Sequence, residues 1–138
     1  MNGRHDMSNS LFSDVSTVTA KLALDGLSLR QETISRNIAN IDTPGYQAQT
    51  VDFQSTLARL VDNNILLPLE ITDKAHLTTK GNELNFSTSL RPGGSYRADQ
   101  NNVDVDVEMA DMSEAGIQYQ AISQALSKKL MLLKTLAK

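Results

Sequence analysis

Hydrophobic residues recur at heptad spacing near both ends of the chain, which has 138 residues. In each region the positions advance alternately by three and four residues, which places them in one stripe along a helix. The first series is Ala20, Leu24, Leu27, Gln31, Ile34, Ile38 and Ile41, and the second is Met112, Ala115, Tyr119, Ile122, Leu126, Lys129, Leu133 and Leu136. The two series predict long helices over residues 14–40 and 108–138, paired as a coiled-coil-like hairpin.

The region between these helices, residues 47–107, follows a different pattern. Apolar positions from Val51 to Val61 predict a short helix that begins near Asp52. Residues 62–102 are rich in Asn, Thr, Ser and Gly, with short apolar runs at 65–69 and 84–86 and a Pro-Gly-Gly sequence within 91–95. This composition predicts loops, a few short strands and a turn or linker at 91–95. The predicted fold class is therefore mainly α, with a small irregular or β middle segment.

Strict alternation of valines and carboxylates precedes the last helix. The sequence of residues 103–108 is Val-Asp-Val-Asp-Val-Glu. A period of two places the valines on one face of a strand and the carboxylates on the other. We therefore predict a short strand here, with its carboxylates in solvent.

Two features concern the first helix and the residues before it. Residues 1–13 are dominated by Asn, Ser, Gly and Asp, which predicts a flexible tail before the helix. Gly26 then interrupts the helix, at a cost of about 1 kcal/mol relative to alanine. A glycine retained at such a cost predicts close packing against a neighbouring helix.

The end of the first helix is predicted by residues 37–46, Asn-Ile-Ala-Asn-Ile-Asp-Thr-Pro-Gly-Tyr. Asn40 tolerates the left-handed conformation that closes many helices, and Thr43 is disfavoured in a helix because a proline follows it. Pro44 and Gly45 suit the second and third positions of a type II turn, which requires a positive φ at the third. We predict that the helix ends near Asn40 and that a sharp turn follows.

Polar side chains cluster at this turn. Asn37 and Asn40 lie three residues apart on one helical face, with amide donors and acceptors beside the turn. They predict a polar joint that contacts a neighbouring subunit, with simple helix capping as the alternative, above all for Asn40. Tyr46 is expected to pack its ring at this joint and to need a hydrogen-bond partner for its hydroxyl.

Charge and cysteine content narrow the classes of partner. The 13 basic and 16 acidic residues are interspersed and give a net charge of −3. Nucleic acids and anionic membranes favour clustered Lys and Arg, so neither is expected as a main partner. Without cysteine the chain forms neither disulfides nor thiolate zinc sites. Residues 1–14 do not resemble a classical signal peptide, and no stretch approaches 18 apolar residues, so we expect neither a cleavable leader nor a membrane span.

Catalysis is not expected from the residues present. One cluster of carboxylates could be considered as an acid/base site. It comprises Asp104, Asp106, Glu108, Asp111 and Glu114. Carboxylates before and within the first turn of a helix complement the helix dipole, so we expect a solvated face rather than an acid/base pair. His5 and His76 lack metal-ligand spacing and are expected at the surface. We predict no enzymatic activity, no metal and no cofactor.

Residues 37–46 resemble the N-terminal signature of the bacterial flagellar rod, hook and hook-associated axial proteins. The matching motif residues are Asn37, Ala39, Asn40, Thr43, Pro44, Gly45 and Tyr46. Within that family, the sequence of residues 101–109 and the later Tyr119-Gln120-Ala121 are most similar to the proximal-rod subunits of the basal body. The resemblance is strong over residues 20–57 and 101–138 and weak between them.

This resemblance implies a structural subunit of the proximal rod. Such a subunit is exported unfolded by the flagellar type III apparatus, without a cleavable signal peptide, and polymerises in the periplasmic space into the axial drive shaft. Its implied partners are copies of itself, neighbouring rod proteins, the rod-base adaptor and the export apparatus. A sibling rod subunit, a cytoplasmic helical export adaptor or chaperone, and a cell-wall-cleaving enzyme are the alternatives.

Residues 53–57, Phe-Gln-Ser-Thr-Leu, resemble the element through which early flagellar substrates meet the export gate. Phe53 and Leu57 would be its two apolar positions. Because an aromatic and an aliphatic residue four apart also form an ordinary packing stripe, core packing is the alternative.

Further apolar residues lie off both heptad series. They are Val15, Val18, Leu22 and Leu29 in the first helix, and Ile117, Leu130, Leu132 and Ala137 in the last. A second stripe predicts further helical neighbours. We therefore expect assembly through two different complementary surfaces, and a free monomer that is only partly ordered.

Overall fold

The computed structural model describes residues 15–62 and 86–136, and most of them are helical. The elements are α2 (Val15–Ala39), β1 (Gln49–Val51), α3 (Phe53–Asp62), β2 (Thr88–Leu90) and α4 (Val105–Leu136). The mainly α fold class with a small β middle segment is confirmed. The predicted tail at 1–13, the apolar run at 65–69, and both histidines lie outside the described residues.

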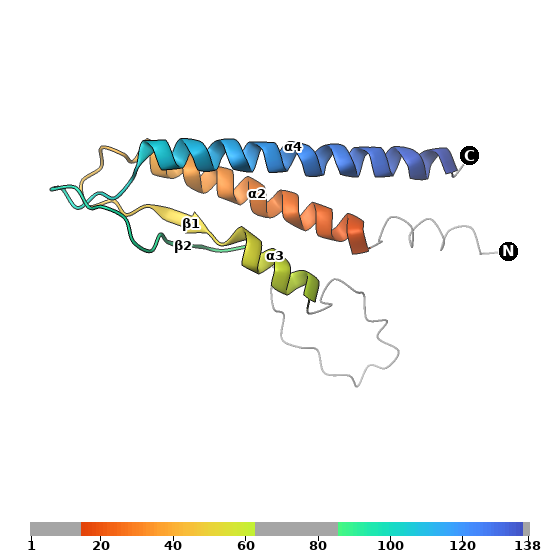
Figure 1. Ribbon diagram of the computed structural model, residues 1–138, viewed down its shortest axis with the longest axis horizontal. Helices are drawn as coiled ribbons and strands as arrows, with labels where there is room; N and C mark the ends of the chain where they lie inside the picture. Colours follow the sequence, from red (N-terminus) through yellow and green to blue (C-terminus); the bar gives the residue numbers. More distant parts are fainter. Residues whose placement is uncertain (1–14, 63–85, 137–138) are drawn as a thin grey trace, which may run out of the picture.

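Helices α2 and α4 form the predicted hairpin. They run antiparallel and pack against each other along α2 (Figure 1). In Figure 1 they lie close together where α2 ends and α4 begins, and they separate toward the beginning of α2. The molecule therefore has a closed end and an open end.

The middle segment lies against α2. Strands β1 and β2 pair antiparallel, with Gln49 opposite Leu90 and Val51 opposite Thr88. Helix α3, which starts one residue after the predicted Asp52, packs on α2. The short helix was predicted, and β2 lies within residues 62–102, where a few short strands were predicted without exact positions. β1 was not predicted, since Gln49 and Thr50 carry no strong strand pattern.

The apolar core lies where α2, α3 and α4 meet. It comprises Ala23, Leu27, Phe53 and Ala115, with Leu57, Phe86 and Ile122 packed around them. The rings of Phe53 and Phe86 stack with centroids 5.5 Å apart. Gly26 faces this stack, and a Cβ at Gly26 would lie only 2.5 Å from the ring of Phe86. The close approach predicted at Gly26 exists, but the neighbour is an aromatic ring rather than a helix.

The residues of the heptad series face the helix interface to different degrees. Leu27, Ile34 and Ala115 are buried, and Leu24, Ile38, Met112, Ile122, Leu126 and Leu133 are half-buried. Tyr119 lies at the edge of the interface and is 38 % exposed. Most residues of the two series thus lie toward the interface, whereas Leu136, the last of the second series, is 83 % exposed.

The strand predicted over residues 103–107 is wrong, because α4 already begins at Val105. Asp104 is its N-cap. The Asp104 carboxylate accepts hydrogen bonds from the backbone N–H of Asp106, at 3.0 Å, and of Val107, at 3.4 Å. A capping aspartate followed by acidic residues in the first turn is as typical of a helix start as alternation is of a strand. Here the capping aspartate, rather than the alternation, corresponds to the structure.

Apolar side chains also lie on the outer surface of α4. Ile117, Met131 and Leu132 are 65 % exposed or more. On α2, by contrast, the off-series residues Val18, Leu22 and Leu29 are half-buried. No helix in residues 15–62 or 86–136 combines the length and the apolar character needed to cross a membrane.

Candidate functional site: the polar joint

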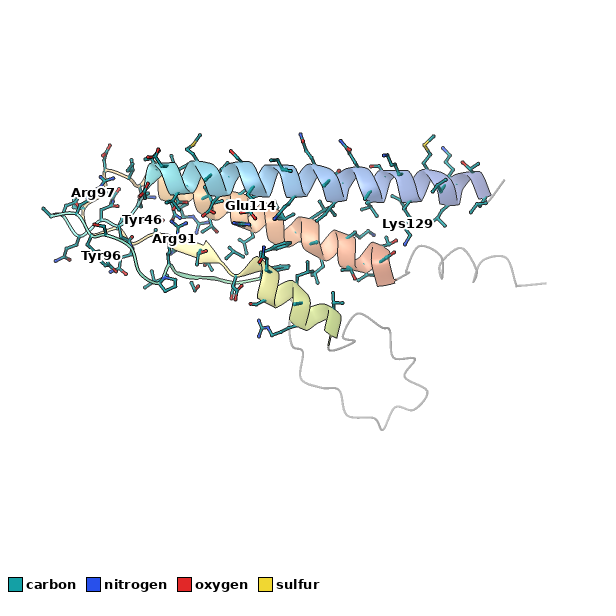
Figure 2. The ribbon with its side chains drawn as sticks, viewed as in Figure 1. Tyr46, Arg91, Tyr96, Arg97, Glu114 and Lys129 are labelled. Carbon is teal, nitrogen blue, oxygen red and sulfur yellow. The ribbon has the colours of Figure 1, made fainter. Side chains whose placement is uncertain are left out.

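The polar joint is the closed end of the hairpin, formed by residues 37–46, β1, residues 91–103 and the first turn of α4. Figure 2 shows Tyr46, Arg91 and Arg97 gathered there. Helix α2 ends at this joint through Asn40, whose side-chain amide donates to the carbonyl of Arg36 at 2.8 Å. Asn40 thus caps the helix, but its predicted left-handed conformation is wrong. Among described non-glycine residues, only Gln100 has a positive φ.

The turn at residues 43–46 has the predicted geometry. The backbone N–H of Tyr46 donates to the carbonyl of Thr43 at 3.2 Å, and Gly45 has a φ of +72°. The N–H of Gly45 donates to the carbonyl of Asp99 at 2.8 Å. The turn is therefore held against the segment that precedes α4, although Thr43, Pro44 and Gly45 are exposed, as is Ala39.

Asn37 connects three segments of the chain from a fully buried position. Its amide nitrogen donates to the carbonyl of Gln49 at 2.8 Å and to the carboxylate of Glu108 at 3.1 Å. Its amide oxygen accepts from the N–H of Gln49 at 2.9 Å and from the hydroxyl of Tyr46 at 3.0 Å. Because both ends of the amide are occupied within the chain, this geometry does not support the predicted contact between Asn37 and a neighbouring subunit.

Glu108 corrects the expectation that the carboxylates of α4 are all solvated. Its side chain is 0 % exposed, and it forms an ion pair with Arg91 at 2.8 Å. Arg91 also pairs with Asp111 at 3.1 Å. A buried carboxylate requires such partners, since an unpaired charge in the interior is strongly unfavourable. Helical geometry turns Glu108 inward, which the strand interpretation could not anticipate.

The remaining carboxylates of the cluster lie at the N-cap and along the first part of α4. Arg30 of α2 pairs with Asp111 at 3.4 Å and with Glu114 at 3.2 Å. Asp104 and Asp106 are exposed. Within residues 15–62 and 86–136, no group of three or more His, Cys, Asp or Glu is placed to hold a metal ion. The cluster thus ties α4 to α2 through Arg30 and to the residue that follows β2, Arg91.

Asn101 is a joint residue whose role the sequence did not reveal. Its side chain is fully buried, and its amide nitrogen lies 2.9–3.0 Å from the carbonyl oxygens of Asn40, Ile41 and Thr43. Its amide oxygen accepts from the N–H of Val103 at 2.8 Å. Asn101 therefore places a second donor at carbonyls just beyond the end of α2, which also accept from the N–H of Thr43, the N–H of Tyr46 and the guanidinium of Arg97. A capping asparagine at the end of a helix can be recognised in the sequence. A capping asparagine that lies about 60 residues away in the chain cannot.

Two further side chains close the joint. Asn102 accepts a hydrogen bond from the N–H of Ala48 at 2.6 Å. Arg97 donates to the carbonyls of Ile41 and Val103, each at 3.2 Å. Like Asn101, both residues contact backbone rather than other side chains, so they fix the path of the chain.

Tyr46 places its ring in the joint, as expected, and its hydroxyl donates to Asn37. Burial raises the pKa of Tyr46 above its ordinary value of 10.0, and the nearby carboxylate of Glu108 raises the pKa further, while Arg36 lowers it. The joint therefore favours the neutral phenol, which can donate its proton to Asn37.

The candidate export element lies away from the joint. Phe53 is buried in the core and stacks on Phe86, and Leu57 packs beside it. In the folded chain this pair therefore serves as packing.

The fold and the joint define a class of protein: a helical structural subunit whose distant chain segments are tied together by buried polar contacts. Consistent with this class, the family described as "Flagella basal body rod protein" matches residues 19–47, which cover most of α2 and its turn. The chain belongs to this flagellar basal body rod protein family, because relatives that are 35–37% identical to it cover more than three quarters of its length.

Its similarity to individual relatives extends over most of the chain. It is 37% identical over 113 residues to the flagellar basal body rod protein FlgB of Bacillus subtilis (strain 168), covering 82% of this chain and 85% of that protein. It is 35% identical over 117 residues to FlgB of Escherichia coli (strain K12), covering 78% and 82%. A third FlgB, from Proteus mirabilis (strain HI4320), is 35% identical over 97 residues, covering 67% and 71%.

Proposed function

We propose that this chain is a structural subunit of the proximal rod, which polymerises with copies of itself and with neighbouring rod proteins into the axial drive shaft of the flagellum. The observation that supports this proposal best is the joint. A set of buried polar groups holds α2, β1 and α4 in one fixed relation. A subunit that transmits torque needs such a fixed relation, because a hinge at this point would absorb the rotation.

The distribution of apolar surface supports assembly. The outer face of α4 exposes large apolar side chains, Ile117, Met131 and Leu132 among them. Exposed apolar surface of this kind on a long helix is typical of a contact with another chain. The function is mechanical and requires neither turnover nor a cofactor, so we propose that the protein is not an enzyme.

We propose that the chain is exported unfolded through the flagellar type III apparatus to the periplasmic part of the rod. Because Phe53 and Leu57 contribute to the core, they are accessible to an export gate only while the chain is unfolded. The absence of cysteine suits this route, since no crosslink has to be broken or formed.

The function is tested by deleting the gene and complementing it with variants of the turn. Pro44→Ala combined with Gly45→Val removes the fixed φ of the proline and disfavours the positive φ of Gly45. No atom lies near a Cβ at Gly45, so the effect comes from backbone strain rather than a clash. We expect a stably expressed protein that fails to restore swimming and complete rods. The matched control, Asp42→Asn with Gln47→Ala, changes exposed residues beside the turn and should restore both.

A deletion strain that swims and builds complete basal bodies would exclude the rod function altogether. Full motility of the Pro44/Gly45 variant would instead leave the rod function standing and exclude the turn as the feature that fixes subunit geometry.

Export is tested separately with Phe53→Ala and Leu57→Ala together. Helical content, measured by circular dichroism, should fall in either case, because the pair packs in the core. If the export gate also needs the pair, the variant accumulates inside the cell; if the pair serves packing alone, export continues. Leu90→Ala, at an exposed apolar position outside the core, is the control.

A further inference from the structure

The open end of the hairpin carries an apolar groove of about 690 Å³ between α2, α3 and α4. Ala20 and Ala23 of α2, Leu57 of α3, and Ile122 and Ala125 of α4 line it. Small residues on α2 leave the groove wide; Ala23 forms its buried floor, and Ala125 on the α4 side is exposed. A hollow of this size and character is typical of a site that another apolar surface covers.

Charge is distributed unevenly along α4. Between residues 104 and 114 every charged residue is acidic, and between residues 115 and 138 every charged residue is a lysine. The helix dipole explains charges in the first and last turns only. Lys128 and Lys129 lie about two turns before the end of α4, so the dipole does not explain them. Lys129 lies at the groove, where it also donates to the hydroxyl of Ser16.

A complementary surface lies at the opposite end of the same helix. Val105, Asp106 and Met109 share one side of the first turns of α4, and all three are exposed. We name these three residues the acidic face. It offers two apolar side chains and one carboxylate, which match the apolar walls and the lysine of the groove.

The groove and the acidic face cannot meet within one chain. Met109 and Ala125 are 16 residues apart on the continuous helix α4, or about 24 Å at 1.5 Å per residue. Any contact between them must join two molecules. Because the two surfaces differ, such a contact is heterologous, and repeated contacts build an open chain of subunits rather than a closed dimer.

We propose that the groove binds the acidic face of a second copy of this chain, with Asp106 of one copy beside Lys129 of the next. The inference rests on the proposed function in one respect, that the chain polymerises, and it specifies which surfaces meet head to tail. Burial of Val105 and Met109 supplies the apolar contact, and the ion pair sets the register and orientation of the two copies.

The absence of cysteine allows a direct test with the full chain. Purified Ala125→Cys is mixed with purified Met109→Cys and oxidised, because a disulfide forms only where two Cβ atoms approach closely. We expect the disulfide-linked dimer that joins the two variants to make up a larger fraction of the product than random collision would give. The matched control replaces Met109→Cys with Ala110→Cys, whose side chain is exposed but points about 100° away around the helix.

Charge reversal gives a second, independent measurement. Asp106→Lys alone and Lys129→Glu alone should each abolish concentration-dependent association, followed by sedimentation velocity. An equal mixture of the two variants should associate again. In that mixture each contact between unlike variants joins opposite charges, either native or reversed on both sides. Attraction therefore returns in chains that alternate the two variants.

Three results would overturn the proposal: a 109–125 dimer no more abundant than the 110–125 control, a mixture of charge variants that stays monomeric, or an Ala125→Cys thiol that resists labelling in dilute monomer. The last result would mean that the chain covers its own groove. None of these measurements depends on motility, so the rod function could stand while this contact fails.

Discussion

At the closed end of the hairpin the buried groups are polar and are paired within the chain, whereas at the open end the helices separate around an apolar groove. Asn37, Glu108 and Asn101 at the closed end find their partners on segments far away in sequence. At the open end, Ala20, Ala23 and Ala125 line a hollow that no described segment fills.

This difference separates two tasks. Buried polar networks specify one geometry, because each member is costly unless every partner is in place. Apolar surfaces are less specific but favour association. The joint can therefore set the shape of the subunit before assembly, and the open end can contribute to assembly itself.

Hydrogen exchange in the dilute monomer gives the largest expected contrast between the two ends. Amides of residues 37–39 in α2 and 108–115 in α4 should exchange most slowly, since opening them requires the joint to break. Amides of residues 16–22 and 128–136 should exchange faster by several orders of magnitude, because local opening there costs little. Uniformly slow exchange along α2 and α4 would contradict this comparison and the partly ordered monomer.

Removing the buried carboxylate should cost the most stability. Glu108→Ala leaves the guanidinium of Arg91 and the amide of Asn37 without a main partner, and we expect a loss of about 3 kcal/mol in the free energy of unfolding. Glu114→Ala, which removes a more exposed ion pair with Arg30, should cost less than about 1 kcal/mol. Urea denaturation measures both. Equal losses would mean that the joint does not dominate stability.

Two glycine substitutions test the apolar region. Gly26→Ala should lose about 1–2 kcal/mol because its Cβ would displace Phe86 and disturb the stack with Phe53. Gly116→Ala, where the nearest atom is 4.0 Å away, should gain about 0.5–1 kcal/mol from helix propensity. In thermal unfolding, the change in stability should therefore be negative for Gly26→Ala and positive for Gly116→Ala. A gain in both variants would show that the Phe86 ring moves aside at no cost.

The smallest expected effect concerns Tyr46. Tyr46→Phe removes the hydrogen bond to Asn37 and should cost about 1 kcal/mol near neutral pH. Because burial raises the pKa of Tyr46 in the folded chain, the wild type holds this contribution below pH 10.0 and loses it as the pH rises further. The stability difference between wild type and variant should therefore shrink above that pH. A constant difference up to pH 11 would show that the phenol is not favoured in its neutral form.

The sequence by itself determined the elements that depend on neighbours a few residues away. The heptad series located α2 and α4 and the faces by which they pair. Pro44 and Gly45 determined the turn, because φ preferences act within single residues. The two motif segments also identified the family, since short stretches of local sequence carry that information.

The alternation at residues 103–107 shows where local pattern fails. The same valines and carboxylates suit a strand and a capped helix, and only the hydrogen bonds from the N–H groups of Asp106 and Val107 to Asp104 decide between them. That choice then turns Glu108 inward instead of into solvent, which reverses the expected role of this residue.

The tertiary structure alone decided the joint. Asn37 meets Glu108 across 71 positions, and Asn101 meets the carbonyl of Asn40 across 61. The sequence places Arg91 in a predicted turn or linker, but its guanidinium supplies the charge that makes burial of Glu108 possible. A buried polar group is favourable only when partners from other segments arrive with correct geometry. Periodicity and local composition describe one segment at a time, so they cannot reveal which partners will meet.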